Sequence, residues 1–294
     1  MKYISTRANY GPVSSAEAIK MGMVPKGGLF VPESIPTIPL NQLARWKNDS
    51  YANIAYHIFS LFLADDFSSQ EINAITGQIY TPPYFDHPQI APVHVLDSQL
   101  AVLELWHGPT AAFKDIALQA LPLLLTQAAH KLSVNHQMLI LVATSGDTGK
   151  AALEGFKDVK GTRIVVYYPY QKVSKIQALQ MRTTEGSNTH VIAIKGNFDD
   201  CQNAVKQIFA DQFFSQTLKE KGYEFSSANS INWGRLFPQI VYYFSAYLEL
   251  IKKNLIQLGE KINIVVPTGN FGNILAAWYA CQMGLPVQKL FCAS

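Results

Sequence analysis

The sequence is poor in charged residues and in cysteine for its length. Only 15% of its 294 residues are charged, the formal net charge is +3, and no basic run is long enough to predict nucleic-acid binding. The three cysteines lie far apart without CxxC or Cys/His spacing, which argues against a zinc site and predicts buried, reduced thiols. No apolar run reaches membrane-spanning length, and no signal core follows Met1. These shortages predict a cytoplasmic protein with a small-molecule partner and with no metal, membrane or nucleic-acid partner.

Apolar residues make up 48% of the chain, which is enough for a large buried core. Between residues 40 and 80 they recur at helical spacing, and Ser68 with Glu71 forms a capping box, so this region is expected to be mostly helical. The continuous apolar run Met138–Ala143 is typical of a strand buried on both faces. The other expected strands are Val93–Leu96, Ala101–Leu105, Arg163–Tyr168, His190–Ile194, Ile262–Val266 and Lys289–Cys292, and the helices between them include Ile116–Leu132, Lys150–Phe156, Ser174–Met181, Phe198–Phe214, Pro238–Leu258 and Asn273–Met283. This alternation predicts an α/β fold in which helices cover parallel sheets.

The stretch His107–Asp115 holds the most informative side chain, Lys114. Three apolar residues precede it, so its amine is expected to face a partly apolar pocket, where desolvation lowers the pKa of a lysine. A neutral amine can attack an aldehyde and form a Schiff base. Asp115 is predicted to N-cap the following helix, in which Pro122 predicts a kink or a late start. A surface lysine beside a helix cap is the alternative interpretation.

The clearest predicted anion site is the turn Pro267–Asn273, between an apolar strand and a helix that starts near Ile274. Its glycines, Gly269 and Gly272, free the backbone to turn N–H groups towards one point, and the helix N-terminus adds partial positive charge. The turn lacks the Gly-Lys-Ser/Thr of a nucleotide P-loop and is not GxGxxG, so it favours a phosphate group over a nucleotide or dinucleotide. A plain tight turn is the alternative.

The turn Thr144–Gly149 repeats this geometry one unit earlier. Thr144, Ser145 and Thr148 offer hydroxyls at a helix start, which suits a substrate carboxylate or phosphate. The carboxylate of Asp147 would repel a bound anion, so this residue is expected to cap the helix or to contact a cation or hydroxyl. The alternative is a helix cap without chemistry.

A third polar segment, Asn229–Arg235, precedes the long helix. Arg235 offers a bidentate fork for phosphate or carboxylate, and Ser230 and Asn232 add neutral hydrogen bonds. A capping turn is again the alternative. Taken together, a pocket lysine, a phosphate turn and two further anion sites suit pyridoxal 5'-phosphate, which needs an amine partner and a phosphate cradle.

These motifs resemble the threonine synthases, members of the tryptophan synthase β-subunit-like family of pyridoxal phosphate enzymes (fold type II). The matching pieces run in order along the chain: 3–7, 25–32, 107–115, 143–149, 172–177, 196–200, 229–235 and 267–273. The resemblance implies a Schiff base at Lys114, cofactor contacts from Asp147 and the phosphate turn, and substrate contacts from two polar segments. The implied cofactor contacts are Lys114, Asp147, Gly269, Asn270, Phe271, Gly272 and Asn273, and the implied substrate contacts are Thr144, Ser145, Thr148, Ser230, Asn232 and Arg235.

The resemblance also implies a domain organisation. It divides the chain into an N-terminal helical domain (1–90), a large cofactor domain (91–117 and 226–294) and a small α/β domain (118–225). Many relatives carry asparagine where this chain has Asp147. The longer microbial branch of threonine synthases carries aspartate at this position, as this chain does. Such enzymes run beyond Ser294, so the C-terminal part of the large domain is expected to lie outside this chain, which alone is expected to have little or no activity.

The implied reaction converts O-phospho-L-homoserine and water to L-threonine and phosphate. Two alternatives stay open at this point. One is another lyase of the same fold that acts on a phosphorylated or hydroxy amino acid. The other is a non-catalytic binding or regulatory protein that retains the scaffold.

Overall fold

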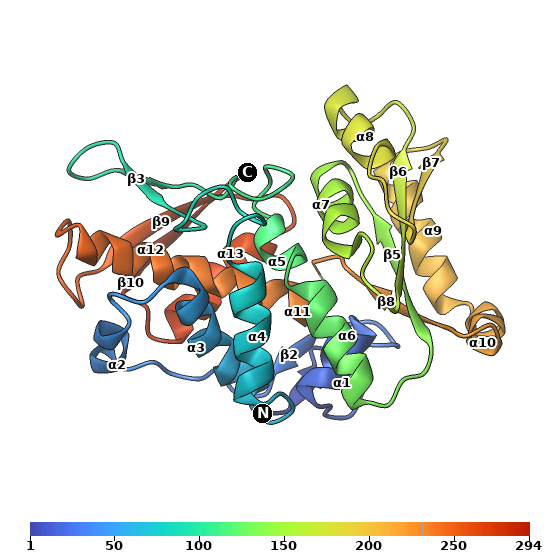
Figure 1. Ribbon diagram of the computed structural model, residues 1–294, viewed down its shortest axis with the longest axis horizontal. Helices are drawn as coiled ribbons and strands as arrows, with labels where there is room; N and C mark the ends of the chain where they lie inside the picture. The colour runs from blue at the N-terminus through green and yellow to red at the C-terminus, as the bar shows by residue number, and fades with distance from the viewer. Residues whose placement is uncertain (231) are drawn as a thin grey trace.

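The computed structural model describes residues 1–230 and 232–294. Its helices and strands form two groups that lie side by side (Figure 1). Residues 40–80 are mostly helical, as predicted, and the residues before them form turns, one helix and two short strands. Together, residues 1–80 form the helices α1 (Ser15–Met21), α2 (Leu40–Arg45), α3 (Tyr51–Leu63) and α4 (Ser69–Ile79), and the antiparallel strands β1 (Tyr3–Ser5) and β2 (Phe30–Pro32). The predicted capping box is present at the start of α4, where Ser68 and Glu71 bond each other's backbone.

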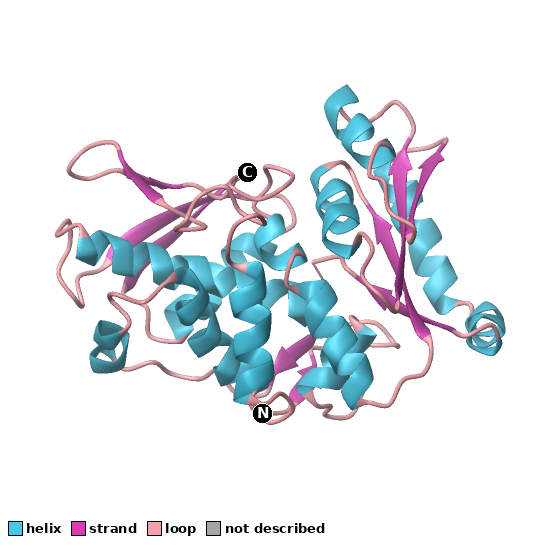
Figure 2. Ribbon diagram, viewed as in Figure 1, coloured by secondary structure: helices cyan, strands magenta, loops and turns pink. Residues whose placement is uncertain are grey.

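One group contains a four-stranded parallel sheet of order β7-β6-β5-β8. Its strands are β5 (Gln137–Ala143), β6 (Thr162–Pro169), β7 (Thr189–Ile194) and β8 (Tyr223–Ser227), and its helices are α7 (Asp147–Phe156), α8 (Lys175–Arg182), α9 (Phe198–Ala210) and α10 (Gln212–Glu220). Helix α7 covers one face and α9 the other (Figure 2). Along β5, Ile140 and Val142 join the main core, whereas Leu141 and Ala143 join a small cluster beneath α9. This alternation confirms a strand buried on both faces.

The other group continues the main core around a second, two-stranded parallel sheet. Its elements are the hairpin strands β3 (Val93–Val95) and β4 (Ala101–Leu103), the helices α5 (Asp115–Leu118), α6 (Leu121–Lys131), α11 (Trp233–Leu236), α12 (Ile240–Lys252) and α13 (Gly272–Gln282), the 3-10 turn η1 (Phe237–Gln239), and the strands β9 (Ile262–Pro267) and β10 (Val287–Ala293). Buried aromatic rings hold the group together, with Trp233 packed against Tyr3, Phe62 and Tyr279.

The structure corrects the predicted bounds of three helices and the predicted burial of one cysteine. The segment predicted as one helix at Ile116–Leu132 is split into α5 and α6. Pro122 lies in the first turn of α6, so it marks a break and a new start rather than a kink or a late start of the whole segment. The predicted helix Phe198–Phe214 breaks at Asp211, whose side chain caps α10, and the one predicted at Pro238–Leu258 begins as a 3-10 turn and ends at Lys252. Strand β8 was not predicted. Cys201 is buried as expected, but Cys292 is exposed.

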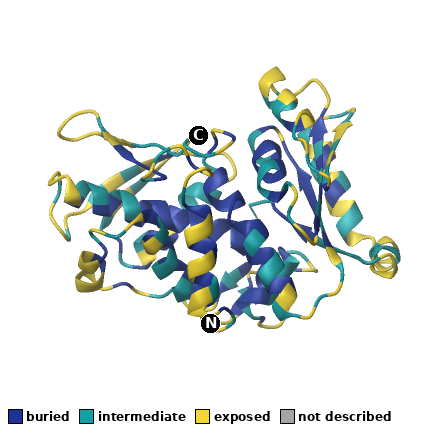
Figure 3. Cartoon of the chain, in the orientation of Figure 1, coloured by how far each residue is buried: buried dark blue, intermediate teal, exposed yellow. Residues whose placement is uncertain are grey.

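Where the two groups meet, every residue of α5 and α11 is buried (Figure 3). Here α7 approaches α5 so closely that a Cβ on Gly155 would lie 2.1 Å from the Leu118 carbonyl oxygen. Only glycine allows this approach, because any side chain would have to displace backbone. Gly155 therefore sets the spacing between the helix that follows Lys114 and the helix that begins at Asp147.

We expect Gly155→Ala to lower the free energy of unfolding by about 1–3 kcal/mol, the range for overpacking a close contact. Alanine is the better helix former, so propensity alone predicts the opposite sign. Gly77→Ala is the matched control, since Gly77 lies on α4 and a Cβ there would meet no described atom within 4 Å. It should raise stability by up to about 1 kcal/mol. Urea titration of both variants checks the pair, and equal effects would contradict the close contact.

Candidate active site

Lys114 lies in the turn immediately before α5, with its side chain 15% exposed. Its Nζ lies 4.2 Å from the centre of the Phe113 ring and 3.4 Å from Asp147 Oδ2. Burial lowers the pKa of Lys114, Asp147 opposes this by favouring the ammonium, and the positive charges of Arg235 and Lys150 lower the pKa further. The net direction is downward, as expected for a lysine that is largely shielded from water.

Asp115 plays a different part from the predicted one. It is the first residue of α5 rather than its N-cap, and its carboxylate closes the turn that precedes Lys114. It accepts hydrogen bonds from Thr110 N (2.9 Å), Thr110 Oγ1 (2.7 Å) and Ala112 N (3.4 Å). Gly108 makes room for this arrangement, because a Cβ there would lie 2.4 Å from Asp115 Cβ. The turn is thus fixed from within, and Lys114 extends from a rigid base.

The turn between β5 and α7 brings Asp147 and Thr148 to the site. Thr144, predicted as a substrate contact, is buried, and its hydroxyl oxygen accepts from Gly146 N (3.0 Å) and Gly149 N (2.9 Å). That oxygen therefore shapes the turn, and its predicted contact with a substrate stays a prediction. Ser145 is exposed at the tip of the turn. Asp147, the first residue of α7, contacts a cation as the sequence suggested.

Lys150 lies beside Asp147 at the site, although the sequence analysis did not identify it as a candidate site residue. It is only 8% exposed, donates from Nζ to the Thr110 carbonyl oxygen (2.9 Å) and lies 3.3 Å from Asp147 Oδ1. The signal was its spacing, because residues three apart on a helix share a face and Lys150 follows Asp147 by three. It connects the turn before Lys114 to the start of α7.

Arg235 on α11 is 5% exposed. Its Nη1 donates to the Ala228 carbonyl oxygen (2.8 Å) and its Nη2 to Thr148 Oγ1 (3.3 Å), so it joins two of the predicted segments. Burial lowers its pKa to about 10. Among the residues that the structure describes, no acidic side chain forms an ion pair with it, although buried charges are normally paired.

Asn232 is a structural residue, contrary to its predicted role in substrate binding. Its side chain is fully buried, donates to the carbonyls of Ile19 (3.1 Å) and Ser227 (2.9 Å), and accepts from Gly234 N (2.8 Å). The available amide in this segment belongs to Asn229 instead. Its buried Oδ1 accepts no hydrogen bond from any described group.

The turn Pro267–Asn273 ends at the start of α13, as predicted, but its glycines are not the strained residues. Phe271 has the left-handed conformation (φ 57°), whereas Gly269 and Gly272 do not have positive φ. The glycines leave space instead. A Cβ on Gly269 would meet no described atom within 4 Å, and one on Gly272 would meet only Ser230 Cβ, at 3.5 Å. The turn and the segment that carries Ser230 therefore lie side by side.

The side chain of Asn273 is held firmly by α12. Its Oδ1 accepts from the hydroxyls of Tyr242 and Tyr243, the latter at 2.6 Å. Both tyrosines are buried, and burial raises the pKa of each, so both remain proton donors at neutral pH. Their two hydroxyls occupy Oδ1 of the Asn273 side chain. Asn273 can therefore offer an anion at the start of α13 its Nδ2 and its backbone N–H, while Asn270 is exposed.

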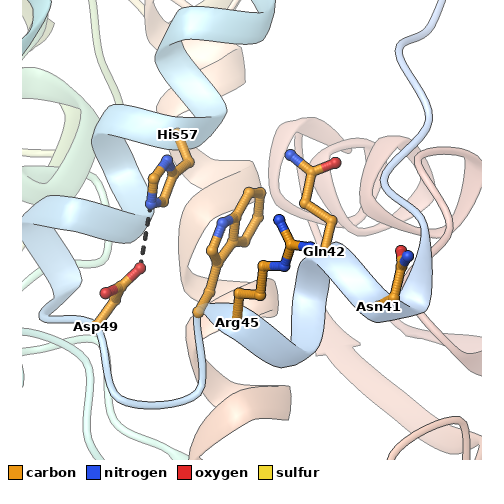
Figure 4. A pocket seen from close by; sticks show the side chains of 6 residues that line it. Asn41, Gln42, Arg45, Asp49 and His57 are labelled. Carbon is orange, nitrogen blue, oxygen red and sulfur yellow. Dashed lines mark hydrogen bonds and ion pairs between the residues drawn. The ribbon is translucent and has the colours of Figure 1, made fainter.

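A separate hollow lies on α2 and α3, away from these segments (Figure 4). It has a volume of about 500 Å³ and is lined by Asn41, Gln42, Arg45, Trp46, Asp49 and His57. His57 faces Asp49 across 3.1 Å. None of the predicted site residues lines this hollow. Within the described residues, no group of three or more His, Cys, Asp and Glu side chains could bind a metal, and no helix is long and apolar enough to cross a membrane.

His107, at the start of the Lys114 stretch, connects two acidic side chains. Its Nδ1 lies 2.7 Å from Asp86 Oδ1 and its Nε2 lies 2.8 Å from Glu104 Oε2. Burial lowers the pKa of His107, but the hydrogen bonds to Glu104 and Asp86 and the charges of both acids outweigh it, so the net pKa is raised above 6.5.

We expect His107→Gln to destabilise the protein in a pH-dependent way. A raised folded-state pKa means that His107 contributes its full stabilisation below the unfolded value near 6.5 and loses it as the pH rises through the folded value. The variant should be less stable by about 0.5–1 kcal/mol in mild acid and equal to wild type in alkali. Denaturant titrations across this range check the sign, with His94→Gln, an exposed histidine on β3, as the control. A difference that grows towards high pH would contradict it.

Comparison with known proteins places this site in a family. Residues 2–80 match the family model "Threonine synthase N terminus", and residues 75–294 match "Pyridoxal-phosphate dependent enzyme". The chain is 39% identical to threonine synthase from Schizosaccharomyces pombe and 41% identical to that from Pseudomonas aeruginosa, over 100% of its own length and 57% and 60% of theirs. The structure of pyridoxal phosphate-bound threonine synthase from Brucella melitensis is similar, with a TM-score of 0.89 and 37% identity over 100% of this chain and 60% of that one.

The chain thus spans about three fifths of the length of these relatives. The matches confirm the predicted α/β fold class and the predicted resemblance. The family model for the cofactor-dependent part covers three quarters of the chain, including Lys114 and the turns at Thr144, Asn229 and Pro267. We conclude that the chain belongs to the family of pyridoxal-phosphate dependent enzymes and carries the N-terminal region typical of threonine synthases.

Proposed function

We propose that this chain carries the active site of a threonine synthase, which converts O-phospho-L-homoserine and water to L-threonine and phosphate. The observation that carries the proposal is Arg235, a buried guanidinium with no acidic partner among the described residues, close to the amine of Lys114. A buried cation needs an anion, and a phosphorylated amino acid supplies one where Lys114 can react. The similar proteins from S. pombe and P. aeruginosa support this choice of substrate class.

The residues fit pyridoxal phosphate as the cofactor. Lys114 has the lowered pKa that favours a neutral amine, and its Nζ would bond the aldehyde carbon of the cofactor. The turn from Gly269 to Asn273 would hold the phosphate group. It leaves open space above two glycines and ends at the N-terminus of an eleven-residue helix, whose first N–H groups lack intrahelical partners. Asp147 lies beside Lys114 and would face the same end of the cofactor.

Pyridoxal phosphate, when bound, withdraws electrons from the substrate and stabilises negative charge on its carbon atoms. The protein supplies the base and the binding groups. Lys114 Nζ is the group placed to take the α-proton, because its lowered pKa leaves more of the amine neutral at neutral pH. The fixed turn behind it, closed by Asp115, keeps that nitrogen in place.

The substrate anion is assigned to the space bordered by α7 and α11. Arg235 has donors beyond the two bonds that it makes, and Thr148, to which it is bonded, can donate its own hydroxyl hydrogen. Ser145 and Ser230 are close in sequence to these groups and add hydroxyls. The buried Oδ1 of Asn229 can only accept a hydrogen bond, so it would suit a donor on the substrate rather than the anion. The cytoplasmic location expected from the composition remains a prediction.

We expect Lys114 to be the lysine that bonds the cofactor. The test is to add pyridoxal phosphate, reduce with borohydride and map the labelled peptides. The pyridoxyl group should be found stoichiometrically on Lys114, and Lys114→Ala should lose it. Lys150 is the internal control, because it is buried nearby but engaged with Thr110 and Asp147. A label on Lys150 with Lys114 unmodified would overturn the assignment.

We expect Arg235→Met to weaken O-phosphohomoserine binding about tenfold to a hundredfold, as loss of a charge-assisted bond of about 1.5–3 kcal/mol predicts. Homoserine, which lacks the phosphate, should lose much less. Isothermal titration of the cofactor-loaded chain with both ligands gives the two ratios. Arg182→Met, at the exposed end of α8, removes the same charge far from the site and serves as the control. Equal losses for both ligands would assign Arg235 to the substrate carboxylate or to structure alone.

A further inference from the structure

The carboxylate of Asp147 is shared among three donors. Its Oδ1 accepts from Gln177 Nε2 at 2.7 Å and faces Lys150 Nζ at 3.3 Å, while its Oδ2 faces Lys114 Nζ at 3.4 Å. The contact with Lys114 is thus long for a hydrogen bond between charged groups, which is usually about 2.7–2.9 Å. The Lys150 contact is about as long, and both Lys150 and the closely bonded Gln177 contact Oδ1, the oxygen that does not face Lys114.

Lys150 is held where it can compete for this carboxylate. It follows Asp147 by three residues on α7, and its second contact, the Thr110 carbonyl oxygen at 2.9 Å, fixes its ammonium at the base of the Lys114 turn. With 8% exposure it has little access to water, so its charge is not screened as a surface charge would be. A lysine engaged in this way is ill-suited to be a nucleophile.

We propose that Lys150 is a positioning residue that draws the Asp147 carboxylate away from Lys114 and thereby keeps the Lys114 amine reactive towards an aldehyde. The inference rests on the proposed role of Lys114 and adds to it. Without Lys150, the hydrogen bond from Gln177 would be the remaining contact on Oδ1, and the carboxylate could pair more closely with Lys114. An ammonium held in such a pair is not a nucleophile.

The charges around the Lys114 amine are predominantly positive. The charged groups that face it are Asp147 and Lys150 on α7 and Arg235 on α11, so two cations and one anion surround its amine. Burial and both cations lower the pKa of Lys114, and Asp147 alone among these charges raises it. Asp115 at the start of α5 faces Lys150 and is engaged with Thr110. Removing Lys150 takes away one cation and leaves Asp147 Oδ1 held by Gln177.

The test uses the cofactor-free protein, so it is independent of the proposed reaction. Each lysine is labelled with trace acetic anhydride over a range of pH, and mass spectrometry gives the apparent pKa of Lys114. Lys150→Met should raise this pKa by about one unit, the lower end of the effect of a charge a few ångströms away, so that labelling of Lys114 at a fixed pH below it falls about tenfold. Asp147→Asn should shift the pKa downward instead.

Two further variants separate this role from a structural one. Lys150→Arg keeps the charge and should keep the Lys114 pKa near the wild-type value, whereas Lys150→Gln keeps a donor for Thr110 but not the charge and should behave like Lys150→Met. Lys150→Gln also carries the test if Lys150→Met does not fold. Lys160→Met, in the exposed turn after α7, is the control for loss of one positive charge and should leave the pKa unchanged. An unchanged Lys114 pKa in a folded Lys150→Gln or Lys150→Met variant would overturn the proposal.

Discussion

The site depends on an imbalance of charge in the poorly hydrated space between α5, α7 and α11. Lys114, Lys150 and Arg235 bring three positive charges, and Asp147 is the carboxylate nearest to the reactive amine. Asp115 is committed to the turn before Lys114, and burial, the largest influence, raises its pKa despite the hydrogen bonds it accepts. Burying this excess of positive charge raises the free energy of the protein without a ligand, and an anion that binds there offsets the cost. The same imbalance lowers the pKa of Lys114 and leaves Arg235 available for a ligand.

The parallel sheets place these charges together. The turn at Thr144 follows β5, the segment from Asn229 follows β8, and these two strands are neighbours that run in the same direction. Ligands of open parallel sheets bind beyond the carboxyl ends of the strands, which is where both segments lie. The turn after β9 brings a third group to the site, next to Ser230. The spacing that lets α5 and α7 share charges is set by Gly155.

Much of this could be read from the sequence, because the signals were local. Apolar runs bounded by turns gave most strands, and the lysine that follows Ala112 and Phe113 stood out by its surroundings. The errors came from contacts that local patterns do not contain. Asn232 looked like a ligand residue because amides bind anions, but its partners include Ile19, more than 200 residues away. Lys150 looked like an ordinary helix lysine, because only the fold shows that the Thr110 carbonyl lies beside it.

The two faces of the four-stranded sheet differ in how much they bury. Beneath α7 the sheet belongs to the main core, but beneath α9 it forms a separate small cluster around Leu141, Ala143, Cys201 and Val205. None of the nine described residues of α10 is buried, and Phe213 is 85% exposed. Segments with few buried contacts open at a lower free energy than the global one. The layer formed by α9 and α10 should therefore exchange its amide hydrogens early, while β5 and the segments that carry Lys114 and Asp147 stay protected. This side of the molecule can then open locally without displacing Lys114 or Asp147.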